Sequence, residues 1–185
     1  MSDVPAFSRP VDIVRIDGAG MVERIEATEH ERTALAASLG IVAIDGLAAE
    51  LTLVREQGGV IRVDGRVAAD IVQSCVVSLV PLAQAIDEPI SLRFAEEGSR
   101  AAQSPPKPAA EIRVDPGEED PAEVLTGTSI DLGAIVVEHL ILAIDPYPRA
   151  PGATPPDNPA EDLPGPGDSP FAVLAELAKS RPKDR

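Results

Sequence analysis

The sequence predicts an α+β fold, in which a twisted antiparallel sheet, either open or rolled into a partial barrel, packs with two to three helices. Three observations support this prediction. Apolar and polar residues alternate through the middle of the chain, which is typical of strands with one buried face. Two other segments, residues 28–39 and 131–144, have the capping residues and apolar content of helices. Short turns separate the strands, which favours antiparallel neighbours.

The first elements are two strands and a helix. Residues 11–16 and 21–27 are expected to be strands on either side of a turn at residues 18–20. Thr28 and Glu31 then form the capping-box pattern that begins a helix. Leu35 and Leu39 lie on one face of this helix, which ends at Gly40.

The middle of the chain is the clearest β region. One strand covers residues 47–54, Gly58 and Gly59 form a hairpin turn, and a long strand follows with alternate residues on an apolar and a charged face. The apolar face holds Ile61, Val63, Val67, Ala69 and Ile71, with Cys75 on the same side, and the charged face holds Arg62, Asp64, Arg66 and Asp70. Cross-strand ion pairs are the preferred interpretation of Arg62 and Arg66, and a nucleic-acid patch is the alternative. A further strand covers residues 86–94, where Pro89 indicates an edge or a bulge.

Two segments after residue 97 have no packing pattern. Residues 98–110 are expected to be a Ser/Pro/Ala loop, and residues 112–114 a brief strand. Residues 115–123 are acidic and rich in turn formers. They are interpreted either as a solvated loop or as a docking site for a basic protein.

A short, almost wholly apolar helix covers residues 131–144. Asp131 caps it, and Pro146 ends it because the residue before a proline avoids the α conformation. At about 100° per residue, Asp131, Ala134 and Glu138 share one narrow solvent face. The remaining residues are expected to be buried against this protein or a partner, because the helix is too short to span a bilayer.

The helix is followed by a rigid Pro-Tyr-Pro-Arg segment. Tyr147 and Arg149 belong to residue types that are enriched at interfaces. The domain is therefore placed at residues 7–149, followed by a Pro/Gly-rich linker at 150–168 and a C-terminal helix with a basic tail at 169–185.

Composition limits the class of function. The chain has 185 residues and a formal net charge of −15, so it repels phosphate backbones and attracts basic proteins. A single cysteine excludes an internal disulfide and a multi-cysteine zinc site, and it fits a reducing cytoplasm. The N-terminus has no signal-peptide pattern.

No catalytic motif is found in the sequence, so no enzyme activity, cofactor or metal is predicted. His30 is expected to be exposed in the first turn of its helix. His139 and Glu138 are adjacent in the helix and point about 100° apart, which favours a structural or interface role over an acid–base pair. Cys75 is interpreted as a small buried apolar residue, with a reactive thiol as the alternative.

Two segments resemble the YceD family of large ribosomal RNA subunit accumulation proteins. The first covers residues 63–79 and includes Gly65 and Cys75. The second covers residues 129–149, from Asp131 and Leu132 to the Asp-Pro-Tyr-Pro-Arg exit. The resemblance extends in order over residues 7–150. Many members of this family have an arginine two residues after the cysteine and further cysteines after the helix. Here position 77 is valine and no later cysteine follows, so a family-type metal site is excluded.

The resemblance implies a cytoplasmic ribosome biogenesis factor, needed for accumulation or processing of large-subunit (23S) ribosomal RNA. Its partner would be the precursor of the large subunit, reached through a basic protein, with weak binding to naked nucleic acid and none to membranes. The candidate interaction residues are Glu138, His139, Asp145, Tyr147, Arg149, Arg62 and Arg66.

Two other classes remain open. One is a small-ligand-binding, barrel-like module, which would need an open apolar interior and a lined cavity of about 300 Å³ or more. The other is an RNA-maturation enzyme, which would need a clustered set of acid, base or metal-binding residues.

Overall fold

The computed structural model describes residues 7–102 and 122–154. The chain divides into two compact units, Met1–Pro151 and Gly152–Arg185. Of the second unit, the structure describes residues 152–154 alone, so the fold below is that of the first unit. The predicted strand at 112–114, most of the acidic segment 115–123, the linker beyond residue 154 and the helix at 169–185 lie outside the described residues.

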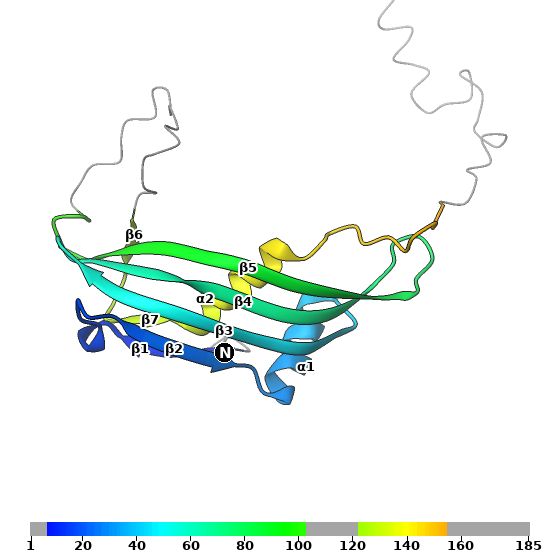
Figure 1. Ribbon diagram of the computed structural model, residues 1–185, viewed down its shortest axis with the longest axis horizontal. Coiled ribbons are helices and arrows are strands. Elements are labelled where there is room, and N and C mark those ends of the chain that lie inside the picture. The colour runs from blue at the N-terminus through cyan, green and yellow to red at the C-terminus, as the bar shows by residue number, and fades with distance from the viewer. Residues whose placement is uncertain (1–6, 103–121, 155–185) are drawn as a thin grey trace, which may run out of the picture. The chain divides into compact units, whose positions relative to one another are not determined.

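The first unit is an α+β domain, as predicted (Figure 1). The elements run in the order β1 (Pro10–Asp12), a 3₁₀ turn (Ile13–Arg15), β2 (Met21–Glu26), α1 (Glu29–Leu39), β3 (Ala43–Glu56), β4 (Val60–Ser74), β5 (Pro81–Glu96), β6 (Glu123–Leu125), β7 (Ser129–Asp131) and α2 (Leu132–Ala143). A five-stranded sheet has the order β2-β3-β4-β5-β6, and β1 pairs with β7 in a separate two-stranded sheet. The sheet is not closed into a barrel.

The long central strands confirm the predicted alternation. β3 and β4 pair in antiparallel register from Ala43 to Glu56, and β4 pairs with β5 along its whole length. The inner face of β4 is buried, and Arg62 and Arg66 lie on the outer face. Gly65 is required where the two strands approach closely, because a Cβ there would overlap the carbonyl oxygen of Glu50.

Pro89 lies on β5, in the part of this strand that pairs with β4 and with no other described strand. Its partner there is Arg66, and β6 pairs with β5 over residues 94–96. The edge position predicted for Pro89 is therefore confirmed, because a proline without an amide hydrogen is tolerated at an edge.

The N-terminal strand prediction is partly wrong. Residues 11–16 do not form one strand paired with β2. A three-residue β1 pairs with β7 instead, with Val11 opposite Ile130, and residues 13–15 form a 3₁₀ turn. The Asp12 carboxylate accepts a hydrogen bond from the Val14 amide at 2.9 Å, and such a local bond competes with extended structure.

The sheet is also not purely antiparallel. β6 pairs with β5 in parallel, with Phe94 opposite Glu123. Neither β6 nor β7 was predicted, because a strand of three residues is too short to show a two-residue period.

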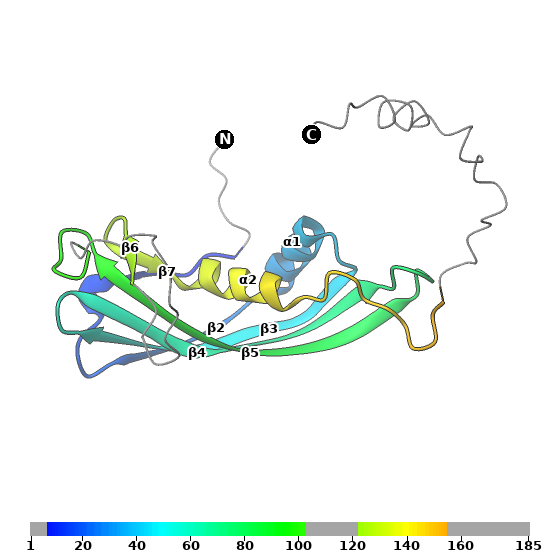
Figure 2. The same cartoon turned by 90° about the horizontal axis from the view of Figure 1, so that it is seen from above.

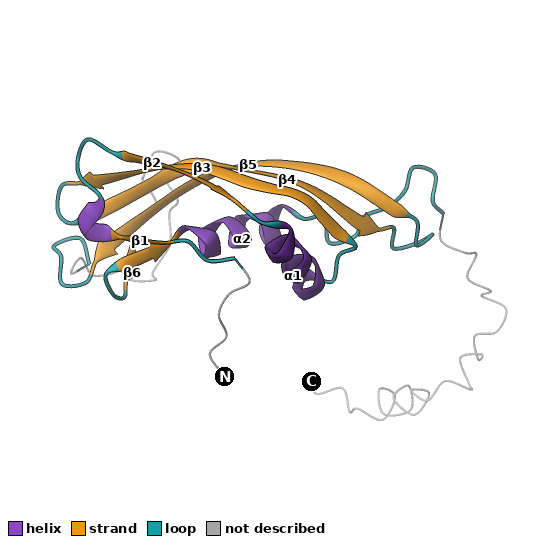
Figure 3. Cartoon of the chain, turned by 90° about the horizontal axis from the view of Figure 1, so that it is seen from below, coloured by secondary structure: helices purple, strands orange, loops and turns teal. Residues whose placement is uncertain are grey.

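Both described helices begin and end as predicted. Thr28 caps α1 with a complete capping box, and Gly40 ends it in the left-handed conformation at φ 66°. Asp131 caps α2, and the helix ends at Ile144. Figures 2 and 3 show both helices on the inner, concave side of the curved sheet, where they cover the hydrophobic core. Neither described helix covers the outer face of the sheet.

Candidate interaction surface

The N-terminus of α2 is fixed by Asp131. Its carboxylate accepts hydrogen bonds from the Ser8 hydroxyl at 2.6 Å, the Arg9 amide at 2.8 Å and the amides of Gly133 and Ala134 at 3.0 and 3.2 Å. Burial alone would raise the pKa of Asp131, but these donors, led by the Ser8 hydroxyl, hold the pKa below its ordinary value. One carboxylate therefore caps the helix and ties the N-terminal segment to it.

The N-terminal segment crosses α2 at close range. A Cβ on Gly133 would lie 2.7 Å from the carbonyl oxygen of Phe7, so glycine is needed at this crossing. Arg9 stacks over the Phe7 ring at 4.5 Å and binds Glu31 of α1 through two nitrogens. This pair fixes the N-terminal segment between the two helices. No local pattern predicts this pair, because Arg9 and Glu31 are 22 positions apart in the chain.

The exposed face of α2 is wider and more apolar than predicted. Ala134 and Glu138 are exposed as expected, but Ile141 and Leu142 are also 48% and 77% exposed. The sequence predicts that both side chains are buried against this protein or a partner. The helical spacing could have predicted their exposure, because residues 141 and 142 lie three and four positions after the exposed Glu138, on the same face of the helix. Among the described residues of the first unit, none covers the side chains of Ile141 and Leu142 completely.

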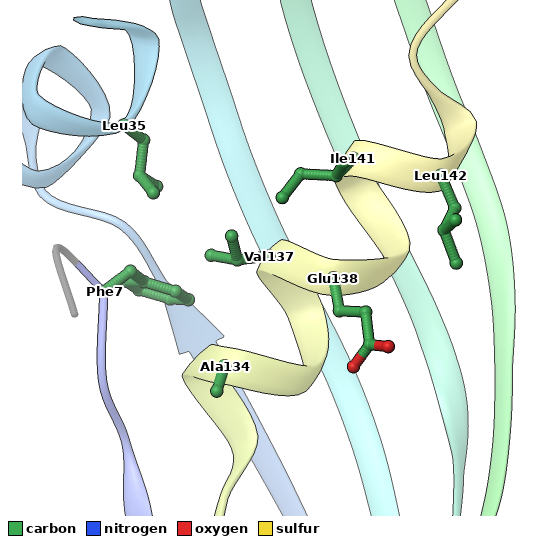
Figure 4. A pocket seen from close by; sticks show the side chains of 7 residues that line it. All are labelled: Phe7, Leu35, Ala134, Val137, Glu138, Ile141 and Leu142. Atoms are coloured by element: carbon green, nitrogen blue, oxygen red, sulfur yellow. The ribbon is translucent and has the colours of Figure 1, made fainter. Parts of the chain in front are cut away.

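An apolar groove lies between α1 and α2. It has a volume of about 330 Å³ and is lined by Phe7, Leu35, Ala134, Val137, Glu138, Ile141 and Leu142. Figure 4 shows Val137 and Ile141 pointing toward Phe7 and Leu35, whereas Glu138 and Leu142 project from the other flank of α2. Glu138 is the one charged residue in this lining. Its carboxylate makes no hydrogen bond or ion pair with any residue that the structure describes.

The segment after α2, residues 145–150, is attached to the end of β4. The Gln73 side chain donates to the Asp145 carbonyl at 2.9 Å, and the Val76 amide donates to the Pro148 carbonyl at 2.9 Å. Tyr147 is nevertheless 72% exposed, because the backbone and not the ring makes these contacts. Arg149 is also exposed. The two segments that carry the family resemblance therefore meet here.

Cys75 lies at this junction. Its thiol is fully buried, and Sγ accepts hydrogen bonds from the amides of Ser78 at 3.4 Å and Ala150 at 3.2 Å. The Ser78 side chain, followed by the Ala150 and Ser78 amides, lowers the pKa of Cys75 to about 6, against burial, which raises it. The sequence predicted the burial but not these donors, because Ala150 is 75 residues away. The sulfur joins two segments and is not accessible to a substrate.

Arg62 and Arg66 lie on the outer face of the sheet, away from the helices. Arg62 pairs with Glu56 at 2.9 Å and with Asp64, and Arg66 pairs with Asp87 at 2.8 Å. The ion-pair interpretation fits these contacts better than the nucleic-acid patch, because the positive charges are already neutralised. The predicted interaction residues thus fall into two groups. One group is on α2 and its exit: Glu138, His139, Asp145, Tyr147 and Arg149. The other group, Arg62 and Arg66, is on the outer face of the sheet.

The described residues hold no catalytic arrangement. Groups of three or more His, Cys, Asp or Glu residues that could hold a metal ion are absent from this part of the chain. His30 is exposed, as predicted, and His139 is half-buried and has no acid partner among the described residues. None of the described helices has the length and apolar content needed to cross a bilayer.

A comparison with family models places these features in a known group. The family described as large ribosomal RNA subunit accumulation protein YceD matches residues 63–178, which is more than half of the chain. The match includes β4 from Val63 onward, Cys75, Asp131 and the α2 exit, but it does not extend to residues 7–62. No curated protein and no solved structure matches the chain. The chain therefore belongs to the YceD family of large ribosomal RNA subunit accumulation proteins.

Proposed function

We propose that this protein is a non-catalytic cytoplasmic factor of ribosome biogenesis, required for accumulation of large-subunit ribosomal RNA. It acts through protein or ribonucleoprotein contacts. The observation that carries the proposal is the family match over residues 63–178. The match covers the two segments that meet at Cys75 and the α2 exit, so it includes the best-defined part of the candidate surface.

Charge supports a protein partner over naked RNA. The net charge is −15, and an acidic field opposes contact with phosphates. Arg62 and Arg66 are neutralised by carboxylates on the outer face. Arg149 is exposed and makes no ion pair with the residues that the structure describes. The protein is therefore expected to reach the RNA through a basic protein, with Arg149 and Tyr147 at the edge of the contact.

Gradient sedimentation tests the function directly. The protein is expected to sediment with precursors of the large subunit in a cell lysate, and a deletion strain should contain less mature large-subunit RNA. Small-subunit RNA from the same strain is the internal control. A normal RNA profile in the deletion strain would refute the proposed function.

Filter binding with purified protein and ribosomal RNA tests the mechanism. Binding to protein-free RNA should be weak at physiological salt. Binding to precursor particles should weaken as salt rises, because exposed charges are screened over about 10 Å at 0.1 M. Tyr147→Ala should lower particle binding, because an exposed aromatic side chain at the edge of the contact is lost, whereas Val14→Ala, which changes an exposed apolar residue on the 3₁₀ turn, should not. Tight binding to protein-free RNA would show that the RNA is contacted directly.

A small apolar ligand is the second candidate, because the groove of about 330 Å³ reaches the size of known ligand sites. Its position argues against this function. Ligand sites enclose most of their ligand, whereas this groove lies on the surface between two helices and the sheet is not closed. Calorimetric titration with medium-chain fatty acids should therefore show no saturable binding, and saturable binding would favour the ligand function.

A further inference from the structure

We propose that the groove between α1 and α2 binds a short amphipathic helix from a basic partner protein. The inference rests on the proposed function, because it identifies the kind of partner through which the protein would act. Three features of the groove support it: its apolar lining, its length, and the carboxylate of Glu138 in that lining, which has no partner among the described residues.

The lining is apolar and partly exposed. Ile141 is 48% exposed and Leu142 is 77% exposed, although α2 belongs to the core. Isolated apolar residues on a surface need no explanation, but Ile141 points with Val137 toward Phe7 and Leu35, and Leu142 adds to the same lining from the other flank of α2. Burying such a patch in a partner is favourable in proportion to its apolar area.

The shape fits a helix. The lining residues of α2 run from Ala134 to Leu142, a distance of about 12 Å at 1.5 Å per residue. They follow a three- and four-residue spacing along α2, and Leu35 of α1 lies across from Val137 and Ile141. A partner helix of about two to three turns would fill this length, with apolar side chains at positions i, i+3 or i+4, and i+7.

The charge identifies the partner as basic. Arg9 and Glu31, at the α1 side, are already paired with each other through two hydrogen bonds. Glu138 has no described partner, so it leaves one negative charge next to the apolar lining. The whole chain adds a field of −15. A helix with Lys or Arg beside its apolar stripe matches both features.

RNA fits the same groove poorly. The Phe7 ring is buried and covered by Arg9, so it cannot stack on a base. The remaining lining residues are aliphatic apart from Glu138, whose carboxylate repels phosphate.

Site-specific crosslinking in the full-length protein tests the inference. A photoreactive benzoylphenylalanine replaces Ile141 in one strain and Val14, an exposed apolar residue of the 3₁₀ turn, in a control strain. Crosslinked products are mapped by mass spectrometry and followed through a sedimentation gradient. Position 141, and not position 14, should crosslink to a lysine- or arginine-rich helix with apolar residues at three- and four-residue spacing.

Two variants add a quantitative prediction. For these variants the benzoylphenylalanine replaces Leu142. Ile141→Asp should reduce the crosslink yield from position 142 at least about tenfold, because a central apolar anchor is lost. Glu138→Lys should reduce it about two- to fivefold, as expected for one exposed ion pair. Val14→Asp should leave it unchanged. Far-UV circular dichroism should show that all three variants remain folded.

The outcomes separate the two proposals. Crosslinks from position 141 to a basic helix of a protein that sediments outside the large-subunit fractions would support the groove inference and refute the proposed function. Sedimentation with large-subunit precursors, but with crosslinks from position 141 to RNA, to lipid or to any segment of the same chain, including residues 1–6 and the basic-ended helix predicted at 169–185, would refute the groove inference and leave the function standing. Equal yields from the wild-type protein and Ile141→Asp would also refute the groove inference.

Discussion

Truncation of Leu140 should destabilise the domain strongly. Leu140 is on α2 with 0% exposure, and its side chain belongs to the core cluster under the sheet. Leu140→Ala removes three carbon groups, which is worth about 2.4 kcal/mol at ~0.8 kcal/mol per buried group. The cavity left behind adds to this, so we expect a loss of about 3 kcal/mol within the usual range of ~2–5.

Leu142 provides a control on the same helix. It is two residues further along and 77% exposed, so Leu142→Ala should cost less than about 0.5 kcal/mol. Urea unfolding followed by far-UV circular dichroism measures both variants, with the dependence on urea unchanged in each. A loss below about 1 kcal/mol for Leu140→Ala, or equal losses for the two variants, would refute the assignment of the buried face of α2.

Three further predictions concern single contacts. The Arg9 side chain, followed by the Thr28 amide, lowers the pKa of Glu31 from 4.5 to about 2. The Glu31 carboxylate therefore stabilises the fold at pH values above 4.5, and this stabilisation is lost as the pH falls toward 2. Glu31→Gln should therefore be less stable than wild type in thermal melts at pH 7, and the difference should vanish near pH 2; a difference independent of pH would contradict the pairing. Cys75 should react slowly with a thiol reagent in the native protein and rapidly in urea, because burial limits access even though its pKa is about 6; fast native labelling would revive the reactive-thiol alternative. Leu79 has φ 60° and is mostly exposed, so Leu79→Gly should raise stability by about 0.5–1 kcal/mol in urea melts, and a loss would show that its side chain packs.

Local signals were sufficient for the long elements. The Thr28–Glu31 capping box, the turn at Gly58 and Gly59 and the two-residue period of β4 each depend on residues that are neighbours in the chain. Asp131 as the cap of α2 is of the same kind. Such interactions act over a few residues, so the sequence shows them directly.

The candidate surface was predicted in part. The exposure of Glu138, Tyr147 and Arg149 agrees with their assignment to a surface. The exposure of Ile141 and Leu142 was missed, because apolar residues in a helix are expected to find a buried partner within the same fold. Whether α1 and the sheet are wide enough to cover them depends on packing geometry.

The sequence by itself determined that this protein has long alternating strands, two capped helices and a strong negative charge, and it carried the motifs of its family. The tertiary structure decided the rest. It attached β1 to β7, brought Ser8 and Arg9 to Asp131, placed the Cys75 sulfur against Ala150 and separated Arg62 and Arg66 from the α2 surface. These contacts join residues 75 or more positions apart, and the two arginines lie on the opposite face of the sheet from α2. They follow from how the chain folds back on itself, and no local pattern encodes that path.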